Sequence, residues 1–369
     1  MISSKGKGAL VNRKMNNIQF KSFYKSLYKY QEKINSELEM FFSDKIKENS
    51  LLFKQAAETI EILKNINLGA GKKIRPILIN IGYFLSGGKN KKAILEACLC
   101  IEFIHNWFLI HDDIIDRDDF RRGKLSLHKF YEKRTKDTHM GISLAITAGD
   151  INVALGYQAL VNSRFQEKFK NKALNVFNET IVNTLHGEML ELSIKKNINK
   201  FKEKDILNVC KYKTAYYTFI NPLKIGAILA GANNRFLDQI EKFALPIGIA
   251  FQIHDDILGL FATKRVLGKP IASDIEENQP NLLVYKTLTS ADKIDKCVFK
   301  KYLGKEKLNQ KEIKEIRRIV KKSGAFNYCE DLANSLVKEA KSILVKMRVA
   351  QKEKKFLLSM ADYIIDREY

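Results

Sequence analysis

The chain has 369 residues, 45% of them hydrophobic, which is the share of a globular protein with a real core, built as one large domain or two ordinary ones. Its 64 Lys and Arg against 42 Asp and Glu leave a net charge of +22, which fits nucleic acid, an anionic membrane or a phosphorylated substrate. The lysines are scattered, and there is no zinc motif, helix-turn-helix motif or aromatic-spaced basic stripe. We therefore expect a compositional bias towards lysine together with a phosphate-bearing substrate, and no nucleic-acid partner.

The sequence leads us to expect no secretory signal and no disulfide framework. Residues 1–14 are polar and basic and lack the apolar core of a secretory signal. The most apolar windows, residues 144–160 and 244–261, each contain aspartate, so we expect no transmembrane segment. The five cysteines form no CxxC pair and lie mostly in apolar helical contexts, as small buried residues do in a reducing compartment. These features predict a cytoplasmic protein.

Helical periodicity runs through nearly the whole chain. Residues 1–17 are predicted to form a flexible basic arm, and residues 18–369 a single domain, because no linker composition interrupts them. In chain order, helical patterns cover residues 18–65, 76–86, 91 to the acidic cluster at 112–116, 144–163, 172–192, 203–217, 222–231 and 235–261, followed by about three more helices, the last at 354–365.

Glycine and proline mark the expected breaks. Residues 68–71 end the first pattern, and Pro76 suits the first turn of the next helix, where its missing N–H costs nothing. We expect a break near Gly149-Asp150 and an irregular polar segment over residues 263–281. Hairpin turns and alternating apolar runs are lacking, so we predict an all-α fold.

The pentapeptide Ile-His-Asp-Asp-Ile occurs twice, at residues 110–114 and 253–257. Each copy follows an apolar helical pattern, and buried carboxylates are costly unless a cation or donor offsets them. In the first copy Asp112 and Asp116 are four apart and share one helix face. Oxygen ligands without cysteine favour a hard cation, and Mg²⁺ is usually shared between one or two carboxylates and substrate phosphates. The repeat therefore predicts a Mg²⁺ site, with Mn²⁺ as a substitute.

Basic residues stand where a phosphate could bind. Lys72 and Arg75 are three apart at a helix start, where free N–H groups and the helix dipole favour anions. Arg121 and Arg122 follow the first acidic copy by one to three turns, and we expect them to come too late to neutralise it. None of these signals is specific alone, but with the acidic clusters they indicate a metal-bound phosphate substrate.

These motifs, in this order, resemble those of the trans-isoprenyl (polyprenyl) diphosphate synthases, the farnesyl and geranylgeranyl diphosphate synthase group. The resemblance extends from about residue 18 to the C-terminus. It rests on Gly71-Lys72-Lys73-Ile74-Arg75-Pro76, His105-Asn106, Asp112-Asp113-Ile114-Ile115-Asp116, Arg121-Arg122-Gly123, Lys213-Thr214, Phe251-Gln252-Ile253-His254-Asp255-Asp256-Ile257-Leu258 and Gly268-Lys269-Pro270. Each segment is weak alone, but the ordered set is very specific.

The resemblance implies an isoprenoid synthase fold around a central cavity, usually in a homodimer. It implies a prenyltransferase that condenses isopentenyl diphosphate with an allylic diphosphate (dimethylallyl, geranyl or farnesyl). By this resemblance, Mg²⁺ would be bound by Asp112, Asp113, Asp116, Asp255 and Asp256. The isopentenyl diphosphate would be held by Lys72, Arg75, His105 and Arg122, and the allylic diphosphate by Arg121, Lys213 and Lys269, with Gln252 and Thr214 lining the site. The five aspartates, Arg121 and Lys213 would carry the catalysis.

Five positions depart from the pattern of the family, and the mildest departure is Lys73 in place of an arginine. Gly259 stands where a third aspartate of the second motif is usual, and we expect this change to be tolerated. Glu188 and Glu191 stand where many members have Gln and Asp. Gln279 stands where many members have Lys, which removes one expected diphosphate contact.

Two aromatic residues bear on the length of the product. Trp107 and Phe108 precede Asp112 by five and four residues, about one turn down the helix that would line the product tunnel. In this family, two aromatic residues there resemble a floor that stops growth early. The sequence therefore predicts a short product, farnesyl (C15) or geranylgeranyl (C20) diphosphate.

Other classes of protein stay open at this point. Gln279 would also fit a non-catalytic or regulatory subunit of a prenyl synthase heteromer, and His111-Asp112 would fit an HD-type metal phosphohydrolase, which needs no second copy. A terpene cyclase would carry an Asn/Ser/Glu second motif, which is absent. An anionic-membrane binder would show salt-sensitive association with liposomes and no turnover.

Overall fold

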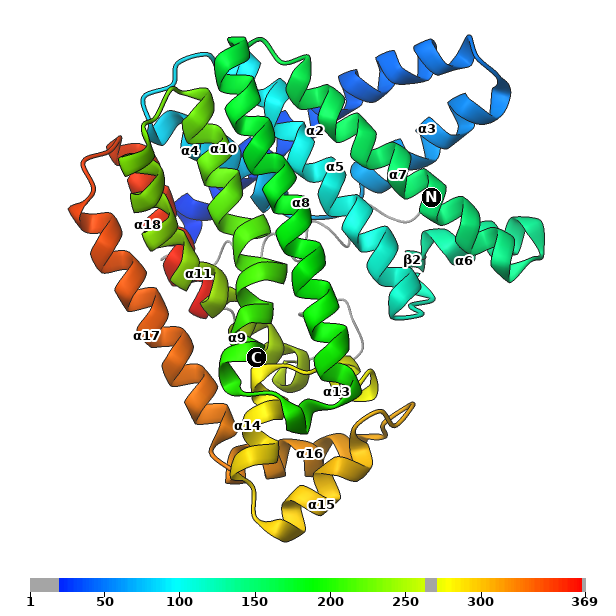
Figure 1. The fold of residues 1–369 in the computed structure, drawn as a ribbon, viewed down its shortest axis with the longest axis vertical. Coiled ribbons are helices and arrows are strands. Elements are labelled where there is room, and N and C mark those ends of the chain that lie inside the picture. Colours follow the sequence, from blue (N-terminus) through cyan, green and yellow to red (C-terminus); the bar gives the residue numbers. More distant parts are fainter. Residues whose placement is uncertain (1–19, 263–270, 367–369) are drawn as a thin grey trace.

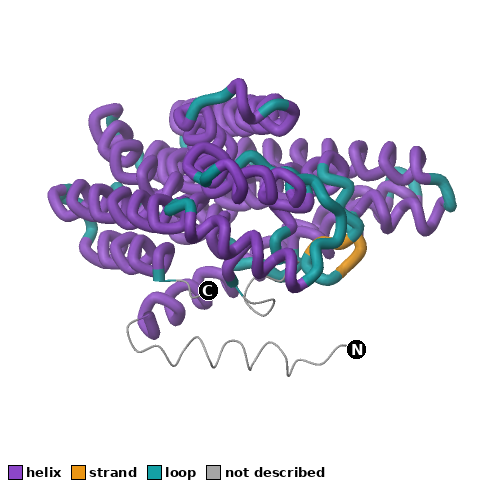
Figure 2. Tube along the Cα trace, turned by 90° about the horizontal axis from the view of Figure 1, so that it is seen from below, coloured by secondary structure: helices purple, strands orange, loops and turns teal. Residues whose placement is uncertain are grey.

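The computed structural model describes residues 20–262 and 271–366, which form a bundle of helices (Figures 1 and 2). The predicted arm over residues 1–17 and the segment with Lys269 lie outside the described residues. The first half contains α2 (Lys21–Ser50), α3 (Lys54–Asn67), α4 (Ile74–Leu85), α5 (Lys91–Ile115), the strands β1 (Phe120–Arg121) and β2 (Lys124–Leu125), α6 (Leu127–Thr135), α7 (Thr138–Val161) and α8 (Glu167–Lys196). The second half contains the 3₁₀ turn η2 (Ile198–Lys200), α9 (Glu203–Val209), the π-helix η3 (Cys210–Ile220), α10 (Asn221–Leu229), α11 (Asn234–Phe261), α13 (Ser273–Glu276), α14 (Leu282–Ser290), α15 (Lys293–Tyr302), α16 (Gln310–Lys322), α17 (Ala325–Lys346) and α18 (Gln351–Ile365).

Two long helices, α5 and α11, organise the bundle. Both begin with an asparagine cap, because the side chains of Asn90 and Asn233 accept the N–H groups of Ala93 and Phe236. α5 packs against α2, α4 and α7, and α11 packs against η3, α17 and α18. Each ends in one copy of the repeated pentapeptide, so the packing of the bundle places the two acidic copies near each other.

The prediction of an all-α fold is confirmed, with several corrections to its elements. The segment predicted as the first helical pattern forms two helices, because the chain turns between Ser50 and Lys54. No glycine or proline marks this turn in the sequence. Helix α7 continues through Gly149-Asp150, where we expected a break. A short antiparallel hairpin, with Phe120 opposite Leu125, was not expected either. After residue 281 the described residues form five helices instead of about three, and the short helix α13 lies within the segment that we expected to be irregular.

Three helices within the described residues are long and apolar enough to cross a membrane, judged by length and composition alone. They are α5, α7 and α11, and 78%, 44% and 67% of their most apolar stretches are buried inside the protein. The expectation of no transmembrane segment relied on the aspartate in each of the windows 144–160 and 244–261, and it did not consider the apolar stretch of α5. For α5 and α11, the apolar character is explained largely by packing within the bundle.

Candidate active site

An acidic cavity of about 280 Å³ lies where the two copies of the repeated pentapeptide meet. The C-terminal ends of α5 and α11 both reach it, and η3 and the segment after residue 271 complete its wall. Its carboxylates belong to Asp112, Asp116, Glu191, Asp255, Asp256, Asp274 and Glu277. Arg121 and Lys213 lie in the same wall, so the cavity combines a strong negative charge with two cations.

The carboxylate of Asp112, near the end of α5, lies where negative charge is unfavourable. Burial raises the pKa of Asp112 to about 7, although Lys213 acts in the opposite direction. Asp116 follows the last turn of α5, and its Oδ1 accepts hydrogen bonds from Gln279 Nε2 at 3.2 Å and Lys195 Nζ at 3.5 Å. A bound cation would therefore relieve repulsion that these contacts leave in place.

The second copy is oriented by a chain of hydrogen bonds. Thr214 Oγ1 donates to Gln252 Oε1 at 2.7 Å, and Gln252 Nε2 donates to Asp256 Oδ1 at 2.8 Å. The other oxygen of Asp256 is buried and has no hydrogen-bond partner among the described residues. Burial and the nearby Asp274 raise the pKa of Asp256 well above its usual range. An orphaned buried carboxylate oxygen beside further carboxylates fits a hard divalent cation.

The protein by itself supplies only part of such a metal site. Among the described residues, no three carboxylate, imidazole or thiolate groups converge closely enough to hold a metal ion. Mg²⁺ normally completes its octahedral shell with water and substrate phosphates, so a partial protein shell suits Mg²⁺ shared with a diphosphate. The donor set therefore fits Mg²⁺, provided that a phosphate ligand contributes.

Asp113 points away from the acidic cavity, unlike the other aspartates of its motif. It is 3% exposed, and Arg121 donates from Nε to its Oδ1 at 2.5 Å. Arg121 also pairs with Asp118 at 2.9 Å. The hairpin turn has positive φ at Arg122 (54°) and Gly123 (77°), and it brings the chain back towards α5. The expectation that no arginine would neutralise the first acidic copy was therefore wrong.

Lys213 is clamped between two carboxylates of α8. Its Nζ lies 2.5 Å from Glu188 Oε2 and also pairs with Glu191. Burial alone would lower the pKa of Lys213, but Glu191, Asp112 and Glu188 outweigh it and raise that pKa. A Cβ on Gly187 would lie 2.4 Å from the backbone nitrogen of Lys213, so only glycine allows α8 and η3 to approach this closely.

Asp274 is a site residue that the sequence did not single out. It lines the acidic cavity from the segment that follows the undescribed residues 263–270. A Cβ on Gly259 would lie 3.1 Å from Asp274 Oδ2, so Asp274 occupies the space beside the position where a third aspartate of the motif was expected. Asn281 Nδ2 holds the same oxygen at 3.3 Å. The carboxylate missing from α11 is thus supplied nearby by another segment.

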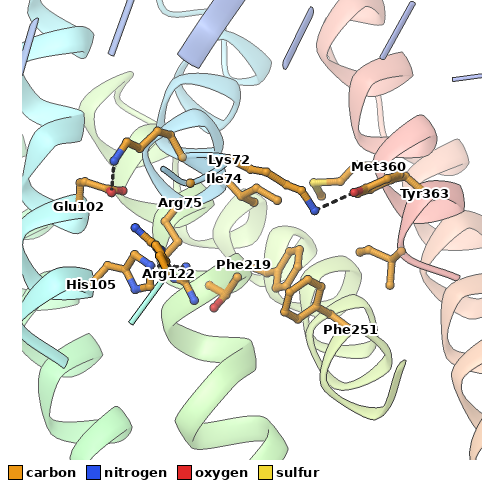
Figure 3. Close-up of a pocket in the computed structure, with 14 residues that line it drawn as sticks. Lys72, Ile74, Arg75, Glu102, His105, Arg122, Phe219, Phe251, Met360 and Tyr363 are labelled. Carbon is orange, nitrogen blue, oxygen red and sulfur yellow. Dashed lines mark hydrogen bonds and ion pairs between the residues drawn. The ribbon is translucent and has the colours of Figure 1, made fainter. Parts of the chain in front are cut away.

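A second, cationic cavity of about 150 Å³ lies beside the first (Figure 3). Arg75, His105 and Arg122 converge on one side, and Lys72 lies on the other, where it donates to the Tyr363 hydroxyl at 2.8 Å. Lys72 and Arg75 flank the start of α4, as the sequence predicted. The cavity is therefore lined by four cationic side chains, of which Lys73 is paired with Glu102, and by a helix N-terminus, which is an arrangement suited to an anion.

The histidine of this cavity is held neutral. Burial, then Arg75 and Arg122, lower the pKa of His105 well below its usual range. Arg75 Nη1 donates to Nε2 of His105 at 3.3 Å, so the proton of the neutral ring lies on Nδ1, which donates to the Tyr217 hydroxyl at 2.6 Å. The buried Nε of Arg75 has no hydrogen-bond partner among the described residues. A diphosphate oxygen would satisfy it.

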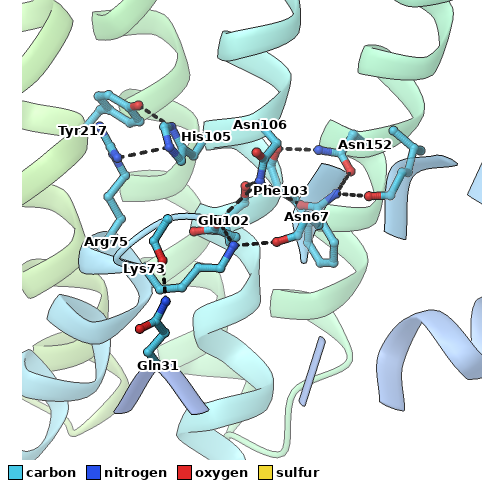
Figure 4. A network of polar contacts seen from close by, with 12 residues as sticks. Gln31, Asn67, Lys73, Arg75, Glu102, Phe103, His105, Asn106, Asn152 and Tyr217 are labelled. Carbon is cyan, nitrogen blue, oxygen red and sulfur yellow. Dashed lines mark hydrogen bonds and ion pairs between the residues drawn. The ribbon is translucent and has the colours of Figure 1, made fainter. Parts of the chain in front are cut away.

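Lys73 lines the cationic cavity, but its ammonium group is engaged in a network of polar contacts (Figure 4). Its Nζ donates to the Asn67 carbonyl at 2.5 Å and to Glu102 Oε1 at 2.7 Å, and the Lys73 and Glu102 side chains are 1% and 3% exposed. Asn106 donates to Asn67 Oδ1 at 3.0 Å, and Asn152 donates to the Phe103 carbonyl at 2.7 Å. This network joins α3, α4, α5 and α7, and thereby fixes the loop that presents Lys72.

The two proposed chain-length residues face different helices. The rings of Trp107 and Phe108 stack with centroids 4.9 Å apart. Trp107 Nε1 donates to His111 Nε2 at 2.8 Å and to Asp150 Oδ1 on α7 at 3.3 Å. The ring of Phe108 meets that of Tyr217 on η3 edge-on, with centroids 5.3 Å apart. The two rings therefore bridge α5 to both neighbouring helices.

The structure groups the predicted site residues into these two cavities. The acidic cavity brings together Asp112, Asp116, Arg121, Lys213, Thr214, Gln252, Asp255 and Asp256. The cationic cavity brings together Lys72, Arg75, His105 and Arg122. Asp113, Trp107 and Phe108 line neither cavity, and Lys269 lies outside the described residues. Besides Asp274, the sequence missed Glu102, Tyr217 and Tyr363, which no motif or spacing distinguished from core residues.

Comparisons with known proteins agree with this geometry. A family model described as "Polyprenyl synthetase" matches residues 57–320. The geranylgeranyl diphosphate synthase of Sulfolobus acidocaldarius is 33% identical over 302 residues, which cover 80% of this chain and 87% of that protein. That of Methanosarcina mazei is 31% identical over 299 residues, covering 81% and 86%. The crystal structure of geranylgeranyl pyrophosphate synthase from Corynebacterium glutamicum, complexed with isoprenyl diphosphate and magnesium, has a TM-score of 0.86 at 24% identity, covering 92% of this chain and 99% of that one.

Proposed function

The chain belongs to the polyprenyl synthetase family, and we propose that it is a short-chain trans-prenyltransferase that condenses isopentenyl diphosphate with an allylic diphosphate. The observation that carries this proposal is that neighbouring residues line the two different cavities. Arg121 lines the acidic cavity, and the next residue, Arg122, lines the cationic one. Likewise, Gln252 lines the acidic cavity and its neighbour Phe251 lines the cationic one. Two diphosphates held there would have their reacting carbons side by side.

The acidic cavity binds the allylic substrate. Asp112, Asp116, Asp255 and Asp256 would hold Mg²⁺, and Asp113 keeps Arg121 in place through their ion pair. Bound Mg²⁺ would supply Lewis-acid stabilisation of the diphosphate that leaves. Lys213 and Arg121 then stabilise the negative charge that develops as the allylic C–O bond breaks.

The cationic cavity positions the second substrate. Lys72, Arg75 and Arg122 would bind the diphosphate of isopentenyl diphosphate, with neutral His105 orienting Arg75. The isopentenyl double bond attacks the allylic cation, a C–C bond forms, and a proton leaves the new cation. The departing pyrophosphate is the base in this proposal. Phe219 and Phe251 line the cavity and help to exclude water that would quench the cation.

The quaternary structure and location belong to the same proposal. Val182, Leu185, Met189 and Leu192 are 50%, 39%, 65% and 40% exposed and form one stripe along α8. Met140 and Leu144 on α7 are 47% and 37% exposed. We propose that these faces form a homodimer interface, that residues 18–369 act as one domain, that Mn²⁺ can replace Mg²⁺, and that the enzyme is cytoplasmic.

The decisive experiment is a turnover assay. Purified protein receives labelled isopentenyl diphosphate with dimethylallyl, geranyl or farnesyl diphosphate, and either Mg²⁺ or EDTA, and the dephosphorylated products are sized by chromatography. A Mg²⁺-dependent C15 or C20 alcohol supports the proposal. No condensation with any primer would favour a non-catalytic subunit, and release of free phosphate instead would favour the phosphohydrolase.

Enlarging the space at Trp107 and Phe108 is expected to lengthen the product. Replacing both by Ala removes the two stacked rings that bridge α5 to α7 and η3, so the growing chain can pass between these helices. Chromatography of the dephosphorylated products should then show alcohols at least one isoprene unit longer. Trp107→Phe keeps an aromatic ring and should leave the product unchanged. An unchanged product from the double variant would show that the floor lies elsewhere.

Replacing Glu188 by Gln is expected to lower KM for the allylic diphosphate by about three- to tenfold. The change removes one negative charge 2.5 Å from Lys213 Nζ, while Glu191 still holds that lysine. The attraction between Lys213 and the substrate phosphates should therefore increase, and kcat should change little. Steady-state kinetics at saturating isopentenyl diphosphate test this. A raised KM would show that Glu188 is needed to position Lys213.

A further inference from the structure

The turn between α2 and α3 exposes three consecutive large apolar side chains. Leu51, Leu52 and Phe53 are 86%, 67% and 62% exposed. In Figure 1 this turn lies at the outer edge of the molecule, where the two helices extend away from the bundle. Single exposed apolar residues are ordinary on protein surfaces, but three in a row are a liability unless something binds them.

The fold does not need apolar residues at this turn. None of the three belongs to the hydrophobic core or to the partly buried side chains packed against it. Phe53 occupies the N-cap position of α3 and provides no side-chain hydrogen bond, although Ser, Thr, Asp or Asn there would stabilise the helix. The exposed sequence therefore gives up local stability and solubility, and its apolar character requires another explanation.

The charges around this tip leave it positive. Glu48 is paired with Lys45 at 2.6 Å, and Glu58 with Arg134 at 2.8 Å. Lys47 and Lys54 are exposed and form no ion pair within residues 20–262 and 271–366. Within the described part of the chain, the exposed acids Asp44 on α2 and Glu61 on α3 form no ion pair, and they lie seven and eight residues from the turn, about 10–12 Å along their helices. The exposed apolar side chains of residues 51–53 therefore lie between two lysines, Lys47 and Lys54, that form no ion pair within the described residues.

We infer that this tip, residues 47–54, docks peripherally on an anionic lipid bilayer. Leu51, Leu52 and Phe53 insert among the headgroups and the adjoining acyl chains, while Lys47 and Lys54 contact anionic lipid phosphates or carboxylates. This binding is independent of the proposed catalytic function. If that function holds, docking places the enzyme at the surface into which its hydrocarbon product partitions.

Vesicle flotation of the full-length protein tests the inference. Vesicles of phosphatidylcholine with 30% phosphatidylserine should carry the protein upward, and vesicles of phosphatidylcholine alone should carry less. The triple variant Leu51→Ser, Leu52→Ser, Phe53→Ser should lower the partition coefficient by at least about tenfold, because it removes three inserted apolar side chains. The double variant Lys47→Ser, Lys54→Ser should abolish the preference for phosphatidylserine.

Controls separate membrane docking from other roles of the tip. Ile294 and Val345, 78% and 58% exposed on α15 and α17, are matched apolar residues elsewhere, and changing both to Ser should leave flotation unchanged. Phe53→Trp should show indole fluorescence that brominated lipids quench. The inference would be overturned if the unchanged protein did not float, or if the triple variant floated as well as the unchanged protein. A changed oligomer mass in the triple variant would also overturn it, because the tip would then be a protein–protein contact.

Discussion

Replacing Asp112 by Asn is expected to lower kcat by about 10³-fold with Mg²⁺ present. The carboxylate lies in the wall of the acidic cavity and would share the cation with the diphosphate. A Lewis acid of this kind is worth several kcal/mol of transition-state stabilisation, and each 1.4 kcal/mol is a factor of ten in rate. Steady-state kinetics at saturating Mg²⁺ and both substrates measure the effect.

The same variant should not lose stability, which separates a lost ligand from a damaged fold. Burial raises the pKa of Asp112 from the ordinary 3.8 to about 7, so the ionised form is disfavoured in the folded protein. The contribution of the Asp112 side chain to folding stability is greatest below pH 4, where the carboxyl group is protonated. This contribution is lost as the pH rises through about 7, because the buried carboxyl group then ionises. At pH 8 without metal, the Asn variant should therefore melt at the same or a higher temperature. Mg²⁺ with pyrophosphate should raise the melting temperature of the unchanged protein and not that of the variant.

Asp119 supplies the matched control for this prediction. It follows Asp112 by seven residues, its side chain is 62% exposed, and it forms an ion pair with Lys129 at 3.5 Å. Asp119→Asn should keep kcat within about twofold. Equal losses in the two Asn variants would show that the acidic segment acts through its overall charge and that Asp112 has no special role.

The sequence predicted the parts of this site that local patterns encode. Apolar periodicity ending in Asp112 and in Asp255 predicted two helices with acidic ends, and both ends do reach one cavity. Lys72 and Arg75 at a helix start predicted a cationic cluster, and these residues line the second cavity. In each case the relevant spacing is three or four residues, which an α-helix converts directly into proximity.

Contacts that depend on a change of chain direction could not be predicted in this way. Arg121 reaches Asp113 because the hairpin reverses at Arg122 and Gly123, both with positive φ, and arginine gives little sign of such a conformation. Asp274 reaches the acidic cavity beside Gly259 from a separate segment, fifteen residues further along the chain. Helical periodicity carries no information about either approach.

The π-helical geometry of η3 was also invisible in the sequence. A π-helix of this length (11 residues) is rare, and such distortions are frequent at functional sites. Two glycines on the flanking helices allow it to be enclosed, because a Cβ on Gly248 would lie 2.4 Å from the Ala215 side chain, and a Cβ on Gly187 equally close to the Lys213 backbone. In the sequence, each glycine stands as a residue of low helix propensity inside a helix, which gives no sign that a close contact requires it.

Gly187→Ala is accordingly expected to impair both folding stability and catalysis. The new methyl group would lie 2.4 Å from the backbone nitrogen and 2.9 Å from Cα of Lys213, and neither atom can move as a side-chain end can. α8 and η3 must separate, which should lower the free energy of unfolding by about 1–3 kcal/mol, as overpacking does. A shift of about 1 Å at a catalytic residue costs about 10²-fold, so kcat should fall by that order because Lys213 and Thr214 move together.

Chemical denaturation and steady-state kinetics on one preparation test both parts of this expectation. Ser193→Ala, at an exposed position of the same helix, is the control and should change the free energy of unfolding by less than about 0.5 kcal/mol. The experiment tests whether catalysis depends on the position of Lys213, so the loss of kcat must be compared with the loss of unfolding free energy. A destabilised Gly187→Ala variant that keeps its full kcat would show that η3 can shift without cost to the reaction. In that case Lys213 would not act through the fixed position in which α8 holds it.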